Sequence, residues 1–222
     1  MTPRLSNDTR QVLIAAGLLA VFAAMAAGLL AFVDENTRDR IALEEHKATL
    51  RSLYQIIPGE RHDNDIVADT VTIPRAELLG QDEPFVVYRA RMGAEPVAVV
   101  MPVVAPDGYS GAIYMMVGVN ADGTVAGVRV VRHKETPGLG DGIEIEKSDW
   151  VTGFDGRSLM DPDSNHWRVR RDGGVFDQLS AATITPRAVI KGVQNALIYF
   201  ERHRDRLFEV KATPEGDENS DS

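Results

Sequence analysis

The stretch AIYMMVGVNADGTVAGVRVVRHKE, residues 112–135, decides the fold class of this chain. In its first half every second residue is apolar, so these side chains would share one face of an extended strand: Ile113, Met115, Val117 and Val119. Ala121-Asp122-Gly123 supplies a turn, and a second run rich in β-branched residues follows it. The pattern predicts an antiparallel β-hairpin.

Further strands are predicted on both sides of this hairpin. The segments DTVTIP (69–74), PFVVYRARM (84–92) and EPVAVVMPVV (95–104) are rich in β-branched residues and bounded by Pro or Gly. HWRVRRDGGVFD (166–177) predicts one more strand with a Gly-Gly turn, and a short helix is expected to start near Ser148.

A helix is predicted at each end of this β-rich region. Residues 36–57 read as an amphipathic helix that Pro58-Gly59 ends, and one face carries an apolar stripe of Leu50, Leu53, Tyr54 and Ile57. Near the C-terminus, Thr185 is predicted to cap a helix whose first residue is Pro186. Its apolar stripe would be Val189, Val193, Leu197 and Phe200. The sequence therefore predicts an α+β fold: an antiparallel sheet with flanking helices.

The N-terminus carries an uncharged span from Val12 to Val33. As a helix it would be about 33 Å long, which matches a hydrocarbon core of roughly 30 Å. The alternative is a cleaved signal peptide, but the apolar region of a signal peptide is only about 7–15 residues long. Arg4 and Arg10 precede the span and Asp34 follows it, so the positive-inside rule predicts a cytoplasmic N-terminus.

These features predict a single-pass protein of the bacterial inner membrane with five segments. They are a cytoplasmic N-terminus (1–11), a transmembrane helix (12–33), a stalk helix (34–60), a periplasmic domain (61–210) and a disordered acidic tail (211–222).

Composition and spacing argue against several classes of function. The net charge of −9 disfavours nucleic-acid binding, and the absence of cysteine excludes disulfides and cysteine-ligated iron–sulfur clusters. No metal site is predicted, because no two of the five histidines have ligand spacing on one element; His133 and Glu135 lie two apart but are more typical of a surface. No Ser-His-Asp arrangement can be argued. Three aromatic residues near loops could stack on a ligand but are more typical of a core or rim: Tyr109, Trp150 and Trp167.

The glycine-rich run GLGDGIE, residues 138–144, follows a predicted strand and partly matches a dinucleotide-binding fingerprint. Ile143 stands where the third glycine belongs, and no βαβ unit follows, so that interpretation is disfavoured. The run is more typical of a tight turn, in which glycines permit close approach of the backbone. A flat ring ligand needs the same close approach.

A second candidate motif is DQLSAATITPRAVIKG, residues 177–192, which places three hydroxyls before the predicted helix: Ser180, Thr183 and Thr185. A phosphate is favoured at a helix N-terminus, where free N–H groups and the positive end of the dipole point at it. The small residues Ala181 and Ala182 leave room for it. Physical chemistry thus permits a phosphate on or near Thr183, while capping by Thr185 alone would explain half of the pattern.

DQLSAAT resembles the flavinylation motif D-x-x-(S/T)-G-A-T, whose last threonine carries FMN through a phosphodiester bond. Asp177, Ser180, Ala182 and Thr183 match this motif, and Ala181 replaces its usual glycine. Residues 108–141 resemble the FMN-binding domain shared by the G subunit of the Rnf (Rsx) electron-transport complex and the C subunit of the sodium-translocating NADH:quinone reductase. The single anchor, the order of the motifs and the short chain fit the Rnf protein better.

The resemblance implies FMN attached to Thr183 by a separate flavin transferase that uses FAD as donor. It also implies an electron-transfer subunit without independent turnover. This subunit would work beside the other membrane subunits of a complex that passes electrons between ferredoxin and NAD. The hydroxyls of Ser180 and Thr185 would bind the phosphate, and four residues of the ETPGLG loop would contact the flavin ring: Glu135, Thr136, Gly138 and Leu139. The alternatives are the quinone reductase protein and a non-redox, membrane-anchored binding or assembly module.

Overall fold

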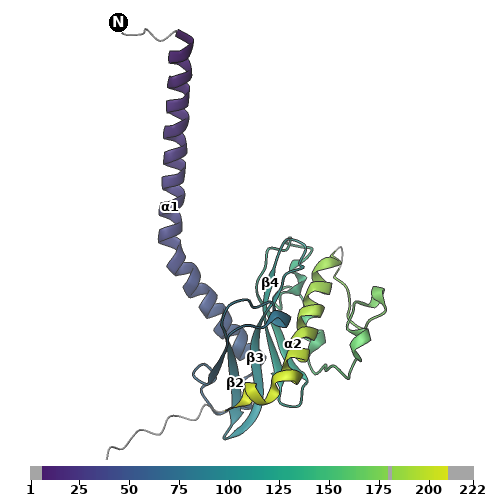
Figure 1. Cartoon of the computed structure of the whole chain (residues 1–222). Helices are drawn as coiled ribbons and strands as arrows, with labels where there is room; N and C mark the ends of the chain where they lie inside the picture. Colours follow the sequence, from purple (N-terminus) through teal and green to yellow (C-terminus); the bar gives the residue numbers. More distant parts are fainter. Residues whose placement is uncertain (1–6, 180–181, 210–222) are drawn as a thin grey trace, which may run out of the picture. The chain divides into compact units, whose positions relative to one another are not determined.

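The structure is a computed structural model that describes residues 7–179 and 182–209. Its first element, α1 (Asn7–Ile56), is a continuous helix of 50 residues, coloured purple to blue in Figure 1. It contains an apolar span, Leu13–Asp34, which is long and apolar enough to cross a bilayer. The span lies within one residue of the predicted one. The chain forms two compact units, residues 1–47 and 48–222, and the last turns of α1 belong to the second unit.

The second unit is built on a five-stranded antiparallel sheet in which each strand pairs with the next along the chain. The strands are β1 (Thr70–Ile73), β2 (Phe85–Met92), β3 (Glu95–Ala105), β4 (Ile113–Asn120) and β5 (Val125–Arg132). The hairpin predicted at residues 112–135 is β4–β5. The three other strands predicted before it are also confirmed, as is the α+β class.

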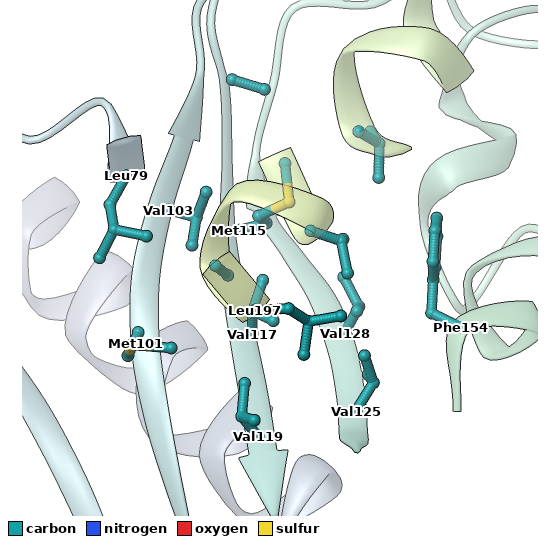
Figure 2. Close-up of a cluster of buried hydrophobic side chains, with 14 of the residues drawn as sticks. Leu79, Met101, Val103, Met115, Val117, Val119, Val125, Val128, Phe154 and Leu197 are labelled. Carbon is teal, nitrogen blue, oxygen red and sulfur yellow. The ribbon is translucent and has the colours of Figure 1, made fainter. Parts of the chain in front are cut away.

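The helix α2 (Ile184–Phe208) covers one face of the sheet and packs against β3 and β4 (Figure 1). The predicted stripe is buried, since Val189, Val193, Leu197 and Phe200 are at most 1% exposed. Figure 2 shows Leu197 among the alternate residues Met115, Val117 and Val119 of β4 and beside Val125 and Val128 of β5. The buried face of β4, formed by every second residue, therefore packs against the buried stripe of α2, and the main core lies between them.

The end of α1 packs on the opposite face of the sheet. Leu53, Ile56 and Ile57 are buried there against Val100 and Met116. Gly118 and Gly127 are paired across β4 and β5, and a Cβ at Gly118 would come within 2.2 Å of the Ile56 side chain. Because these glycines have no side chain, the end of the helix can approach the sheet closely. The predicted stripe was wrong in one residue, because Tyr54 is half exposed and Ile56 is buried instead.

Six short 3₁₀ helices connect these elements in the described residues: Gly59–Arg61, Glu77–Leu79, Asp141–Ile143, Asp149–Phe154, Ser164–His166 and Arg170–Asp172. The helix Asp149–Phe154 is the short helix expected near Ser148, whose hydroxyl caps it by accepting a hydrogen bond from the Trp150 N–H.

The strand predicted at residues 166–177 was wrong, because this segment is a compact loop with a single isolated bridge between Val169 and Phe176. Trp167, Val169 and Phe176 are buried, which produced the strand-like pattern. They anchor the loop around Phe154, with Trp167 and Phe176 ring centroids 6.2 Å and 4.6 Å from that of Phe154. A loop that buries such side chains without strand partners can give the same sequence pattern as a strand.

Two buried arginines of β2 hold the C-terminal end of α2. Arg89 donates to the Glu209 carbonyl at 2.5 Å, and Arg91 donates to the Phe208 carbonyl at 2.7 Å. Both arginines also pair with Asp69. The last carbonyls of a helix lack intrahelical partners and form its negative end, so these guanidinium groups fix α2 in place.

Candidate functional site

A cavity of about 250 Å³ lies at the N-terminus of α2. Three segments of the second unit form its wall: the loop before β4, the loop after β5 and the first residues of α2. Its lining residues are Tyr109, Glu135, Thr136, Leu139, Gly140, Ala182, Thr183, Ile184 and Thr185. The sequence motifs GLGDGIE and DQLSAAT, which lie about 40 residues apart in the chain, therefore meet at one site.

Thr183 is the N-cap residue of α2, and its side chain makes no capping hydrogen bond. The prediction that Thr185 caps the helix was wrong. Thr185 lies in the first turn and is 1% exposed, and its hydroxyl donates a hydrogen bond to Oε2 of Glu135. Pro186 is accordingly the third residue of the helix rather than the first. The Thr-Pro pair gave the expected signal for a helix start, but a buried carboxylate binds the hydroxyl that would otherwise cap.

Glu135 is a buried carboxylate that joins the three walls of the cavity. Its Oε1 accepts a hydrogen bond from the Ser110 N–H at 2.9 Å, and its Oε2 accepts the Thr185 hydroxyl. A carboxylate buried this deeply needs such donors, because an unpaired buried charge is strongly unfavourable. These bonds connect the loop before β4, the loop after β5 and the first turn of α2, so Glu135 fixes the geometry around Thr183.

Glycine is needed at position 140 because the backbone passes against this carboxylate. A Cβ on Gly140 would lie 2.8 Å from Cβ of Glu135 and 2.9 Å from its Oε2. Gly138 adopts a positive φ of 78°, and its N–H donates to Oδ1 of Asp141 at 2.7 Å. The expected tight turn and close backbone approach of the glycine run are both present.

His133 and Glu144 close the base of this loop, with 2.6 Å between Nε2 of His133 and Oε1 of Glu144. Nδ1 of His133 accepts the backbone N–H of Glu135 at 3.0 Å, so the proton of a neutral ring lies on Nε2 and points at Glu144. His133 therefore contacts the backbone of Glu135 and not its carboxylate. In the described ranges, no group of three or more His, Asp or Glu residues could hold a metal ion.

The remaining predicted site residues are placed as follows. Thr136, Leu139 and Ala182 line the cavity, whereas Gly138 and Asp177 are not part of its lining. Asp177 is exposed, pairs with Arg170 at 3.0 Å, and accepts the Trp150 indole N–H on its carbonyl at 2.6 Å. Ser180 and its neighbour Ala181 lie outside the described residues.

A second ion pair joins the loop of Arg170 to α2. Arg187 binds Asp172 through two hydrogen bonds of 2.7 and 2.9 Å, and this contact holds the pKa of Asp172 below its usual value. Because Arg170 of the same loop pairs with Asp177, these two ion pairs connect the start of the DQLSAAT motif to α2, the helix that follows the motif.

Three residues of the cavity were missed or undervalued by sequence reasoning. Tyr109 is 70% exposed at the rim, in contrast to Trp167, which is buried in the core. Ile184 is half exposed beside Thr183, and Gly140 makes room for Glu135. The signal for Tyr109 was its place between two glycines in DGYSG, which permits a loop but does not reveal what the loop faces.

A larger cavity of about 450 Å³ lies between the end of α1, β5 and residues 144–146. Three arginines line it, Arg51, Arg129 and Arg132, together with Glu144 and Glu146. None of the residues of the two sequence motifs except Glu144 reaches it. We therefore assign the candidate site to the smaller cavity, where both motifs meet.

Comparison with known proteins shows the family of the chain. Residues 108–198 match the FMN-binding domain family, and residues 1–56 match the RnfG N-terminal region. The chain is 47% identical over 191 residues to the G subunit of the ion-translocating oxidoreductase complex of Shewanella oneidensis, covering 86% of this chain and 90% of the relative. It is 49% identical over 198 residues to the protein of that name from Pseudomonas aeruginosa, covering 89% and 92% of the two chains.

Proposed function

The chain belongs to the RnfG family, the G subunits of ion-translocating oxidoreductase complexes, and on this premise we propose that it is the membrane-anchored subunit that carries FMN covalently on Thr183. Within such a complex it relays electrons on the path between ferredoxin and NAD. Its partners are the other membrane subunits, and a flavin transferase matures it. The domain lies on the periplasmic side of the inner membrane. The match to the RnfG N-terminal region favours this function over that of the related quinone reductase protein.

One observation carries the proposal: Thr183 lines a cavity of an FMN-binding domain at the N-terminus of a 25-residue helix, with a hydroxyl that is not used for capping. The first N–H groups of a helix have no intrahelical partners and favour a phosphate oxygen. Attachment from FAD requires no base in this chain. The Thr183 oxygen bonds to the phosphorus of the FMN half, the pyrophosphate bond breaks, AMP leaves, and the hydroxyl proton goes to the transferase or solvent.

The residues around the cavity fit one part of a flavin rather than all of it. A cavity of about 250 Å³ is smaller than the roughly 300–1,000 Å³ that encloses a whole small molecule. Leu139, Ile184 and Tyr109 offer exposed apolar surface at the rim, against which a ring can lie. FMN supplies a carrier that accepts electrons one or two at a time. The open rim leaves a bound ring accessible to redox partners. Glu135 holds the loop before β4 and the first turn of α2 in a fixed arrangement.

The test is a mass measurement on the full chain, purified in detergent after co-expression with a flavin transferase. We expect the wild type to carry the mass of one FMN in a peptide that contains Thr183, with flavin fluorescence in a denaturing gel. Thr183→Ala should lose both signals and keep its fold. Thr136→Ala removes a different hydroxyl from the same cavity and should keep the flavin. Covalent FMN on the Thr183→Ala protein would refute the assignment.

A further inference from the structure

The charge of the cavity wall is unusual for a site that is to hold a phosphorylated ligand. Among the lining residues that the structure describes, Glu135 is the only one with a charged side chain, and no lysine or arginine is present. Sites that bind phosphates reversibly normally present guanidinium or ammonium groups to them. Here the one charge has the same sign as the phosphate.

We propose that Glu135 makes this cavity reject free FMN and other phosphorylated anions, so that the flavin stays only when a covalent bond holds it. Glu135 is thus a specificity-determining residue that acts through its charge. The inference rests on the proposed function, because it concerns the same cavity and the same cofactor.

The helix N-terminus cannot offset this charge for a second anion. Glu135 already sits at the positive end of α2 through its bond to the Thr185 hydroxyl, and a carboxylate there takes up part of the favourable potential. Pro186 has no N–H, so the first turn offers one donor fewer than an ordinary helix. The phosphate of free FMN would therefore lie near the like charge of Glu135, in a partly buried site with few remaining hydrogen-bond donors. Such a site disfavours the charged form of the phosphate.

Covalent attachment reduces the repulsion as well as supplying the bond. A phosphate monoester carries a charge of about −1.5 to −2 near pH 7, whereas the diester formed with Thr183 has a single ionisable oxygen. The cavity is therefore better suited to the attached form than to free FMN. The cavity should also discriminate between FMN and riboflavin, since riboflavin has the same ring and no phosphate.

The test measures free flavin binding to a chain that cannot be modified. Full-length Thr183→Ala is titrated with FMN and with riboflavin, and binding is followed by flavin fluorescence. We expect riboflavin to bind more tightly than FMN. In the double variant Thr183→Ala/Glu135→Gln, FMN should bind about tenfold more tightly, while riboflavin affinity should change less than about threefold. A glutamine can accept from the Ser110 N–H and donate to the Thr185 oxygen, so both contacts of the carboxylate are kept.

The matched control is Thr183→Ala/Glu146→Gln, at an exposed glutamate. It removes the same charge from the same loop, at a residue that lines the other cavity, and should leave the FMN-to-riboflavin ratio unchanged. A second measurement needs no change at Glu135. Raising the ionic strength should tighten FMN binding to Thr183→Ala relative to riboflavin, because salt screens like-charge repulsion. This arm decides the question if the Glu135 variant does not fold.

Four results would overturn the inference: tighter binding of FMN than of riboflavin to Thr183→Ala, an equal gain for both flavins on removing the charge, no FMN binding to the double variant, or the opposite salt dependence. The outcome is separate from that of the proposed function. Absence of covalent FMN from the wild type would refute the function, whereas flavin binding to the Thr183→Ala proteins reports only on the cavity and its charge.

Discussion

The hydrogen bond between Thr185 and Glu135 should contribute more to stability than a helix cap would, and Thr185→Val tests this. Valine has nearly the same shape as threonine and keeps the β-branch, so packing around this residue, which is 1% exposed, is preserved. The change removes the hydroxyl that donates to Oε2 of Glu135. The second carboxylate oxygen keeps its bond from the Ser110 N–H, so the loss is confined to one contact.

The expected cost follows from the burial of the carboxylate. A hydrogen bond to a charged group contributes about 1.5–3 kcal/mol, and a buried acceptor left without its donor incurs a desolvation penalty in the same range. Loss of a solvent-exposed cap would cost about 1 kcal/mol. Against this, the added methyl group is buried and recovers roughly 0.8 kcal/mol. We therefore expect Thr185→Val to lower the free energy of unfolding by about 1–2 kcal/mol after this compensation.

A double-mutant cycle with Glu135→Ala, which removes the acceptor, separates the contact from the side effects of each change. If the two groups interact as the structure indicates, the double variant should be less destabilised than the sum of the single variants, by about 1–2 kcal/mol. Urea unfolding of the unmodified chain in detergent, followed by tryptophan fluorescence, is a suitable assay because both tryptophans, Trp150 and Trp167, lie in the second unit. A coupling energy below about 0.5 kcal/mol would show that the carboxylate does not depend on this hydroxyl.

Three further predictions concern the same site and the anchor. Gly140→Ala should destabilise the domain by about 1–3 kcal/mol in urea unfolding, because the new Cβ would lie within 3.0 Å of Glu135, whereas Gly153→Ala, which meets nothing within 4 Å, should cost much less. A phosphatase fused to the C-terminus should be active in the periplasm, and activity of a cytoplasm-only reporter fused there would contradict the topology. Ala181 should permit modification of Thr183, although more slowly than Ala181→Gly if the usual glycine adopts a positive φ. Intact-mass time courses with the transferase and FAD in excess measure this, and an unmodified wild type rescued by Ala181→Gly would contradict it.

The sheet and the helices could be predicted because their patterns are local. The alternation in β4 and the stripe of α2 each report a single buried face, and turn glycines separate the strands. The segment 166–177 failed for a physical reason. Its buried residues anchor a loop around Phe154, and sequence periodicity does not distinguish a strand partner from a cluster of aromatic rings.

Part of the lining of the candidate cavity could be predicted from the sequence, but its contacts could not. The motifs identified Glu135, Thr136, Leu139 and Thr183, and the structure brings all four to one cavity. The bond between Thr185 and Glu135 spans 50 residues of sequence, and no local pattern announces it. For the same reason the sequence suggested that Thr185 was the cap and left the side chain of Glu135 without a partner.

The two threonines at the start of α2 therefore have separate roles, although the sequence pattern suggested a single one. Thr185 is buried and bound to Glu135, so its hydroxyl is not available for a cap or for chemistry. Thr183 occupies the capping position without making the capping bond, and so the helix forgoes about 1 kcal/mol that a capping side chain would contribute. A stabilising contact left unmade at a cavity is typical of a functional site. If Thr183 capped α2, its oxygen would be engaged with a backbone N–H and less accessible to a modifying enzyme. Because Glu135 binds Thr185, the first turn is fixed without the Thr183 hydroxyl, and that hydroxyl remains available for the attachment of flavin that we propose.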